Sequence, residues 1–125
     1  GRYDQAFSDL DEYITIPVRR PEVKQVYHTY VIRAAERDGL LAHLLENGIE
    51  AKVHYPIPLH LQVAAAHLGY REGDFPVCEE HCRSIITLPA HQHLTDDEID
   101  YVISQVRGFY KTGPARQMIA KHSQA

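Results

Sequence analysis

The chain has 125 residues, 44% of them hydrophobic and 24% charged, and a formal net charge of −4 at neutral pH. This length and composition indicate one globular domain rather than two, and they argue against general disorder. The net negative charge argues against a nucleic-acid-binding protein, which presents a basic surface. No apolar stretch approaches the roughly 20 residues that span a bilayer. We therefore expect a domain that binds neither nucleic acid nor membrane.

Hydrophobic spacing and turn-forming residues predict the elements in chain order. A helix is predicted over residues 3–14, followed by a linker around Pro17 and Pro21 and a strand over residues 26–33. The remaining predicted elements are a helix capped by Asp38 and stopped at Asn47-Gly48, a strand over 49–55, helices over 59–68 and 76–83, a strand over 84–88, and a helix that begins after Thr95.

Two of these segments indicate how the predicted sheet is built. The strand at 26–33 is apolar on both faces, so we expect it inside the sheet rather than at an exposed edge. Residues 49–55 alternate between an apolar face and a polar face formed by Glu50, Lys52 and His54. Because strand, helix and strand follow one another within about 30 residues, they predict a right-handed βαβ crossover. We expect an α/β fold of α+β character, with a small mixed sheet of about three strands packed with helices.

The two cysteines and nine histidines raise the question of a metal site. Cys78 and Cys82 lie four residues apart in a predicted helix, where a disulfide would be strained, so we expect reduced thiols and a cytoplasmic protein. A structural zinc ion needs four ligands, whereas Cys78, His81 and Cys82 supply three, so we predict no metal site. His91 and His93 are interpreted as solvated side chains of a turn.

The densest group of chemically capable side chains is HYPIPLHLQ, residues 54–62, at the end of the predicted strand 49–55. It joins two imidazoles and a phenol with two prolines that stiffen the loop. Such loops at strand ends are frequent ligand sites in α/β proteins. The residues by themselves support a ligand site and a structural turn equally. No nucleophile elbow, phosphate loop or Schiff-base lysine context is present, so we assign no catalytic residue.

Four sequence blocks occur in the order and spacing of one protein family. They are VYHTYVIRA (26–34), RDGLLAHLLENGIEAKVHYPIPLHLQ (37–62), LGYREGDFPVCEE (68–80) and ITLPAHQHLTDDEIDYV (86–102). Together they resemble the C-terminal domain of the DegT/DnrJ/StrS family, which are pyridoxal-phosphate-dependent sugar aminotransferases with the type I aminotransferase fold. The resemblance implies one such domain over residues 1–112, with an N-terminal helix and linker over 1–24. The polar residues after Gly113-Pro114 predict a frayed tail over 113–125.

The resemblance also implies that the chain is the last third of a longer enzyme, whose N-terminal domain holds the pyridoxal 5′-phosphate and its lysine. That enzyme would transfer an amino group, typically from glutamate, to a keto-sugar that is often nucleotide-linked. It implies His54, Tyr55 and Pro56 as the substrate-facing loop and places His28 and His60 near the same cleft. Family members are usually homodimers, and the isolated domain is expected to be inactive and to bind no cofactor.

Two alternatives stay open. A sugar dehydratase of the same family would have another residue in place of the catalytic lysine, at a position outside this chain. A freestanding module that binds a small ligand for regulation would use a similar arrangement of strands and helices. The family often has glycine and threonine where this chain has Glu50, Ala51 and Lys52, which leaves the substrate class open.

Overall fold

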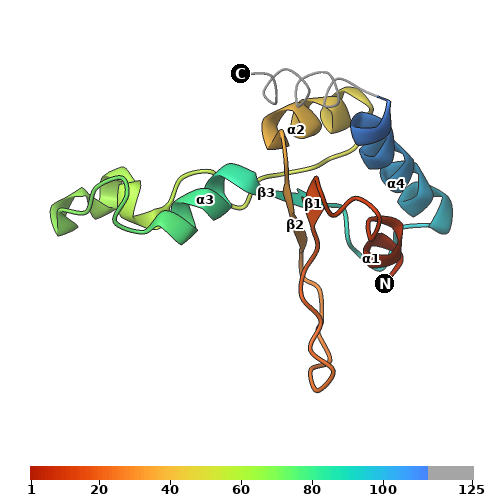
Figure 1. Ribbon diagram of the computed structural model, residues 1–125, viewed down its shortest axis with the longest axis horizontal. Helices are drawn as coiled ribbons and strands as arrows, with labels where there is room; N and C mark the ends of the chain where they lie inside the picture. The colour runs from red at the N-terminus through yellow and green to blue at the C-terminus, as the bar shows by residue number, and fades with distance from the viewer. Residues whose placement is uncertain (113–125) are drawn as a thin grey trace.

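The computed structural model describes residues 1–112, which combine a small sheet with helices (Figure 1). The elements are α1 (Arg2–Ala6), β1 (Ile14–Thr15), β2 (Tyr30–Ala34), α2 (Arg37–Glu46), the 3₁₀ helices η1 (Leu59–Leu61) and η2 (Val63–Leu68), α3 (Pro76–Ser84), β3 (Ile85–Leu88) and α4 (Asp96–Lys111). The predicted tail over 113–125 lies outside the described residues. Within residues 1–112, no helix combines the length and the apolar composition that crossing a membrane requires.

The strand order is β1-β2-β3, and both neighbouring pairs run antiparallel. β2 is the central strand, as its two apolar faces predict. The α/β class with a small sheet of three strands packed with helices is confirmed. The named strands pair only in the antiparallel sense, however, where the sequence predicts a mixed sheet.

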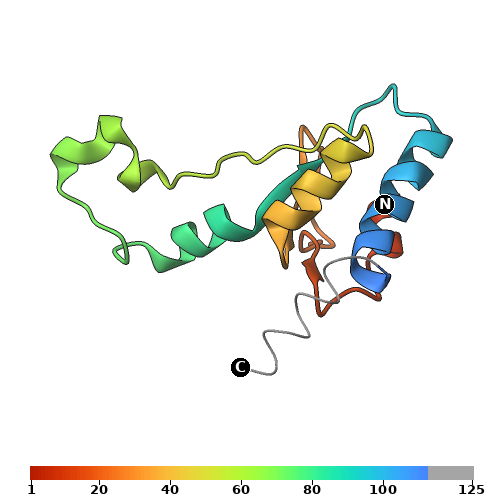
Figure 2. The ribbon, with the colours of Figure 1, turned by 90° about the horizontal axis from the view of Figure 1, so that it is seen from above.

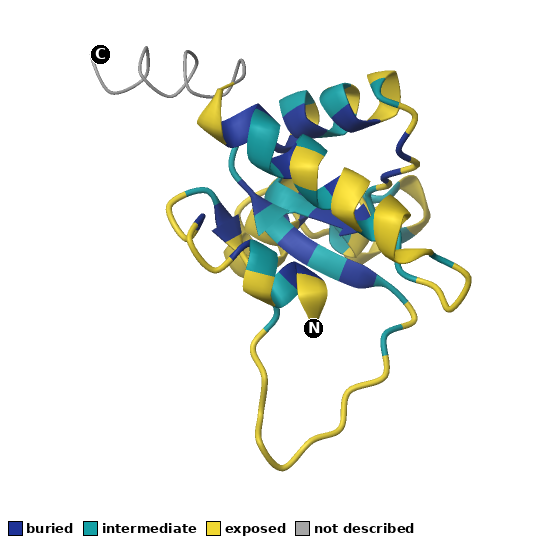
Figure 3. Ribbon diagram, turned by 90° about the vertical axis from the view of Figure 1, so that its right-hand side faces the viewer, coloured by how far each residue is buried: buried dark blue, intermediate teal, exposed yellow. Residues whose placement is uncertain are grey.

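One face of the sheet carries the core of the domain. The strand register places six buried side chains on this face: Ile14, Tyr30, Ile32, Ala34, Ile86 and Leu88. Helices α1, α2 and α4 contribute further buried members of the same cluster, among them Leu44 of α2 and Phe109 of α4, and the turns after α1 and segment 49–55 contribute the rest. Figure 3 shows the buried side of these helices turned toward the sheet. The hydrophobic effect therefore fixes which face of the sheet the helices cover.

The helix predicted over residues 3–14 is much shorter, because α1 ends at Ala6. The chain turns at Phe7 and Leu10, where the amide of Ile14 donates to the carbonyl of Leu10, and Ile14 then enters β1. Phe7, Leu10 and Ile14 are all buried. Their spacing fits a helix, but a series of turns points the same three side chains into the core.

α2 begins before its predicted cap. Glu36 occupies the N-cap position, and Asp38 pairs with the guanidinium of Arg37 at 2.6 Å instead of capping the helix. The same buried guanidinium donates to the carbonyls of Cys82, at 3.1 Å, and Ile85, at 2.8 Å. Arg37 therefore ties α2 to the junction between α3 and β3.

The predicted βαβ crossover is wrong in its pairing. Segment 49–55 forms a single bridge, in which Lys52 pairs antiparallel with Thr87 of β3. β3 thus lies between β2 and this segment, which runs parallel to β2 but is not its neighbour. Ile49 and Ala51 are buried, as the alternation predicts, whereas Tyr55 of the same predicted face is exposed. Alternation determines which side chains of a strand are buried but not which strand lies beside it, so a later strand can take the neighbouring position.

Residues 55–84 leave the sheet as an extended segment, which we call the arm (Figures 1 and 2). It begins directly after His54, carries η1, η2 and α3, and returns into β3. The helix predicted over 59–68 is wrong in type, since Gln62 has extended dihedrals and divides it into two 3₁₀ helices. The helix predicted over 76–83 is confirmed as α3. Several large apolar side chains of the arm are more than half exposed: Tyr55, Ile57, Leu59, Val63, Leu68 and Val77.

The N-terminus of α4 is capped as predicted, because Thr95 and Glu98 form a reciprocal capping box. The Glu98 amide donates to Thr95 Oγ1 at 3.2 Å, and the Thr95 amide donates to the Glu98 carboxylate at 2.8 Å.

We expect Thr95→Ala to lower the free energy of unfolding by about 1 kcal/mol, since it leaves amides of the first turn without their acceptor. Urea denaturation measures the change. Ser104→Ala, at an exposed position of the same helix, is the control, and equal losses in the two variants would contradict the role of the cap.

Candidate functional site

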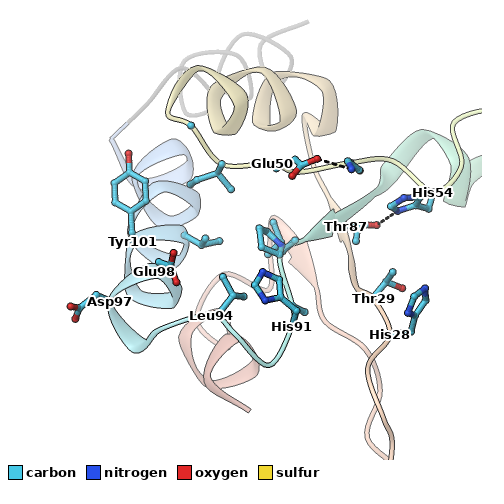
Figure 4. Close-up of a pocket in the computed structure, with 17 residues that line it drawn as sticks. His28, Thr29, Glu50, His54, Thr87, His91, Leu94, Asp97, Glu98 and Tyr101 are labelled. Atoms are coloured by element: carbon cyan, nitrogen blue, oxygen red, sulfur yellow. Dashed lines mark hydrogen bonds and ion pairs between the residues drawn. The ribbon is translucent and has the colours of Figure 1, made fainter.

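A cavity of about 590 Å³ opens between segment 48–54, the end of β3 and the first turns of α4 (Figure 4). We call it the edge cavity. Its polar lining consists of His28, Thr29, Glu50, Lys52, His54, Thr87, His91, Asp97, Glu98 and Tyr101. Ile49, Leu88, Leu94 and Val102 add an apolar wall. Apolar surface with a few convergent polar groups and a volume of several hundred Å³ is typical of a small-molecule site.

His54 reaches this cavity because of the bridge two residues earlier. The amide of Thr87 donates to the Lys52 carbonyl at 2.7 Å, and the amide of Lys52 donates to the Thr87 carbonyl at 3.1 Å. This pairing holds the end of segment 49–55 against β3. The His54 ring then lies with Nδ1 at 2.9 Å from the Thr87 hydroxyl (Figure 4). The imidazole is half-buried, with one nitrogen engaged by the sheet.

Tyr55 lines a second cavity, of about 650 Å³, at the base of the arm. We call it the arm-base cavity, and its other lining residues are His54, Asp74, Phe75, Pro76, Val77, Cys78, His81, Cys82 and Ile85. The Tyr55 ring meets the His54 ring edge-on, with 5.5 Å between centroids. His54 therefore lies between the two cavities and is part of both linings. Pro56 follows on the exposed surface of the arm.

His60 lies farther out on the arm, where it is hydrogen-bonded to Glu79 of α3. The distance from His60 Nε2 to Glu79 Oε1 is 3.0 Å, and both side chains are buried. The Glu79 carboxylate also accepts from the amides of Gly73, at 2.9 and 3.0 Å, and Phe75, at 3.3 Å. Burial alone would raise the pKa of Glu79, but these backbone bonds and the His60 ring lower it below the usual range. The carboxylate thereby joins η1, the loop at 73–75 and α3.

The five predicted substrate-side residues are thus not gathered in one place. His28 and His54 line the edge cavity, and His54 and Tyr55 line the arm-base cavity. His60 is enclosed by the arm and hydrogen-bonded to Glu79. Substrate contact by these residues stays a prediction.

Sequence reasoning missed Thr87 and Glu79 as the polar partners of the two histidines. Thr87 is the one polar residue in the apolar sequence of β3, and this was the available signal. Glu79 stands beside Glu80, and nothing in the sequence distinguishes the buried carboxylate from the exposed one. The sequence interpretation also placed His91 in a solvated turn, and this exposed residue forms part of the edge-cavity lining.

The described lysines do not fit a pyridoxal phosphate site. A lysine that forms a Schiff base is activated by a desolvating pocket or a second cation. Lys52 instead pairs with Glu50 at 2.7 Å, and Lys111 pairs with Asp9 at 2.9 Å. Lys24 is exposed in the connection between β1 and β2. Within residues 1–112, no lysine therefore has the surroundings that activate a Schiff-base lysine.

The structure also describes the cysteine and histidine pairs that raised the question of a metal site. Cys78 is exposed and Cys82 is buried, both as free thiols, and burial raises the pKa of the Cys82 thiol. The rings of His91 and His93 lie 6.2 Å apart. Between residues 1 and 112, no group of three or more histidine, cysteine, aspartate or glutamate side chains is arranged to hold a metal ion.

Comparison with solved structures defines the fold class. The described fold matches the S. venezuelae DesV protein, whose crystal structure contains a ketimine intermediate, with a TM-score of 0.83 and 34% sequence identity. The match covers 88% of this chain and 29% of that chain. The residues therefore have the fold of part of a type I aminotransferase.

Comparison of sequences identifies the family. The model of the DegT/DnrJ/EryC1/StrS aminotransferase family matches residues 1–107, and the chain belongs to this family. A pleiotropic regulatory protein of Geobacillus stearothermophilus is 43% identical over 86 residues, which cover 69% of this chain and 23% of the relative. The dTDP-3-amino-3,4,6-trideoxy-alpha-D-glucose transaminase of Streptomyces venezuelae is 37% identical over 94 residues, covering 75% of this chain and 25% of the relative. The chain spans about a quarter of the length of these curated relatives.

Proposed function

We propose that this chain is the C-terminal, substrate-side domain of a pyridoxal-phosphate-dependent sugar aminotransferase. Its substrate is a nucleotide-linked keto-sugar, and glutamate is the amino donor. The observation that carries the proposal is the family match over residues 1–107, joined to a similarity that covers about a quarter of a sugar-nucleotide transaminase. His54, which lines both cavities, and Tyr55, which lines the arm-base cavity, are the proposed sugar-facing residues.

The proposed role of the domain is to bind and orient the sugar. A neutral imidazole carries one donor and one acceptor, so His54 can bond a hydroxyl or carbonyl oxygen of the sugar through the nitrogen that Thr87 leaves available. The Tyr55 phenol, 69% exposed, adds a second group of the same kind. When bound in the complete enzyme, pyridoxal phosphate supplies the electron sink for amino transfer. The apolar wall of the edge cavity would limit water around the sugar.

The exposed surface of the arm supports the proposal that this chain is one domain of a larger enzyme. Six of its large apolar side chains are more than half exposed, among them Leu59 at 76% and Val63 at 93%. Apolar surface of this extent on one segment is typical of an interaction site. We propose that the arm packs against the cofactor-binding portion of the enzyme, and that the complete enzyme is a homodimer.

Cofactor trapping tests this proposal. The isolated chain, incubated with pyridoxal phosphate and reduced with borohydride, should show no stoichiometric cofactor adduct by mass spectrometry. The complete polypeptide should trap one cofactor and transfer an amino group from glutamate to a dTDP-linked keto-sugar. A stoichiometric adduct on one lysine of the isolated chain would contradict the domain role. Loss of a hydroxyl from the sugar without amino transfer would instead identify a dehydratase.

A further inference from the structure

The orientation of the His54 ring depends on one hydrogen bond. Within residues 1–112, the 2.9 Å contact between Nδ1 and the Thr87 hydroxyl is the sole hydrogen bond of the His54 side chain, and also the sole one of the Thr87 hydroxyl. An imidazole with one nitrogen engaged in this way presents the other nitrogen, Nε2, to a ligand. The residue at position 87 therefore determines how the His54 ring is oriented and which ring nitrogen can bind a ligand.

Thr87 is held in the sheet from both sides. Its backbone pairs with Val31 of β2 on one side and with Lys52 on the other. The residue is 8% exposed, and threonine is restricted at χ1 by its branched Cβ. The hydroxyl accordingly lies at a fixed point of the sheet, whereas His54 is the last residue before the arm.

We propose that Thr87 is the residue that positions His54, by holding Nδ1 so that Nε2 is the ring atom offered to the sugar. This inference rests on the proposed function only for the identity of the ligand. The hydroxyl can donate to an unprotonated Nδ1 or accept from a protonated one, so it fixes the ring plane in either tautomer. A functional group supported by a rigid second residue keeps its geometry without reorganising when the ligand arrives.

Thr29, the other threonine that lines the edge cavity, provides a matched control. Thr29 lines the same cavity but makes no side-chain hydrogen bond to His54. Thr87→Val removes the hydroxyl and keeps the branched shape, and Thr87→Ser keeps the hydroxyl. Thr29→Val removes a cavity hydroxyl that is not hydrogen-bonded to the ring. Position 87 is thus compared with a threonine of the same cavity.

The first experiment measures the ring-nitrogen NMR resonances of His54 in the isotopically labelled chain. Thr87→Val should move the Nδ1 resonance toward that of an exposed histidine such as His81, while Thr87→Ser and Thr29→Val should leave it close to the original position. Unchanged ring signals in Thr87→Val would overturn the proposal. A hydroxyl that served only the packing of β3 would affect stability but not follow this pattern.

The second experiment uses the complete aminotransferase and follows the sugar half-reaction. Loss of one supporting hydrogen bond should lower kcat/KM for the sugar about tenfold in Thr87→Val, with recovery in Thr87→Ser and no change in the half-reaction with glutamate. Equal activity of Thr87→Val and the original enzyme would overturn the positioning role in the reaction. If His54→Ala also left the sugar half-reaction intact, the proposed substrate contact would fail, whereas the NMR result tests the Thr87–His54 contact independently.

Discussion

Replacing His54 with alanine is expected to lower the sugar half-reaction of the complete enzyme on the order of 100-fold, the usual cost of removing one well-placed hydrogen-bonding group from an active site. The half-reaction with glutamate should be spared, because in the proposed function His54 faces the sugar and not the cofactor. Single-turnover measurements of the two half-reactions give the comparison.

The control for this prediction is His93→Ala. His93 is exposed in the loop before α4, and it is not among the lining residues of the edge cavity. We expect its replacement to change neither half-reaction. Equal loss of both half-reactions in His54→Ala, accompanied by a lower melting temperature, would point to a folding defect and against a role in binding the sugar.

Replacing Glu79 with alanine is expected to open the arm. The change removes the acceptor of the Gly73 and Phe75 amides and the partner of His60. Hydrogen bonds to a charged group are stronger than neutral ones, so amide exchange at Gly73 and Phe75 should accelerate about 10- to 100-fold. Hydrogen-exchange NMR on the isolated chain measures this directly.

Glu80 offers the matched control on the same helix. Its carboxylate is exposed and lies 3.7 Å from Arg83, an ion pair of the kind that contributes little. Glu80→Ala should leave amide exchange in the arm unchanged, and a similar acceleration in both variants would contradict the role of Glu79.

The stabilisation by Glu79 should depend on pH, because folding lowers the pKa of its carboxyl group. Its contribution to the free energy of unfolding is present above the ordinary glutamate pKa of about 4.3 and is lost as the pH falls through the lower pKa of the folded state. In Glu79→Ala that acid dependence should be reduced.

Local signals in the sequence predicted part of the fold well. The capping box at Thr95 and Glu98 and the amphipathic pattern after it place α4 correctly. Gly48 and Gly69 end their helices with positive φ values of 73° and 75°, as glycine does without a steric penalty. These features depend on a few neighbouring residues, and for that reason sequence alone can specify them.

Features that depend on distant partners were not predictable in the same way. The place of β3 between β2 and Lys52 is decided across the sheet, and no local pattern encodes it. The loop that contains His54 stands out in the sequence by its composition, and its contact with substrate stays a prediction. The different surroundings of His54 and His60 were not predictable, because their hydrogen-bond partners, Thr87 and Glu79, lie 33 and 19 residues farther along the chain.

The hydrogen bonds around Glu79 have a consequence for assembly. They give the arm its shape within this chain, so the arm would lose little conformational entropy when it meets a partner, and its exposed apolar surface could be converted more fully into affinity. A segment that folded only on contact would bind more weakly for the same area. In the proposed function, such a preorganised arm suits complementation in trans, in which this chain and the cofactor-binding portion are supplied as two separate polypeptides.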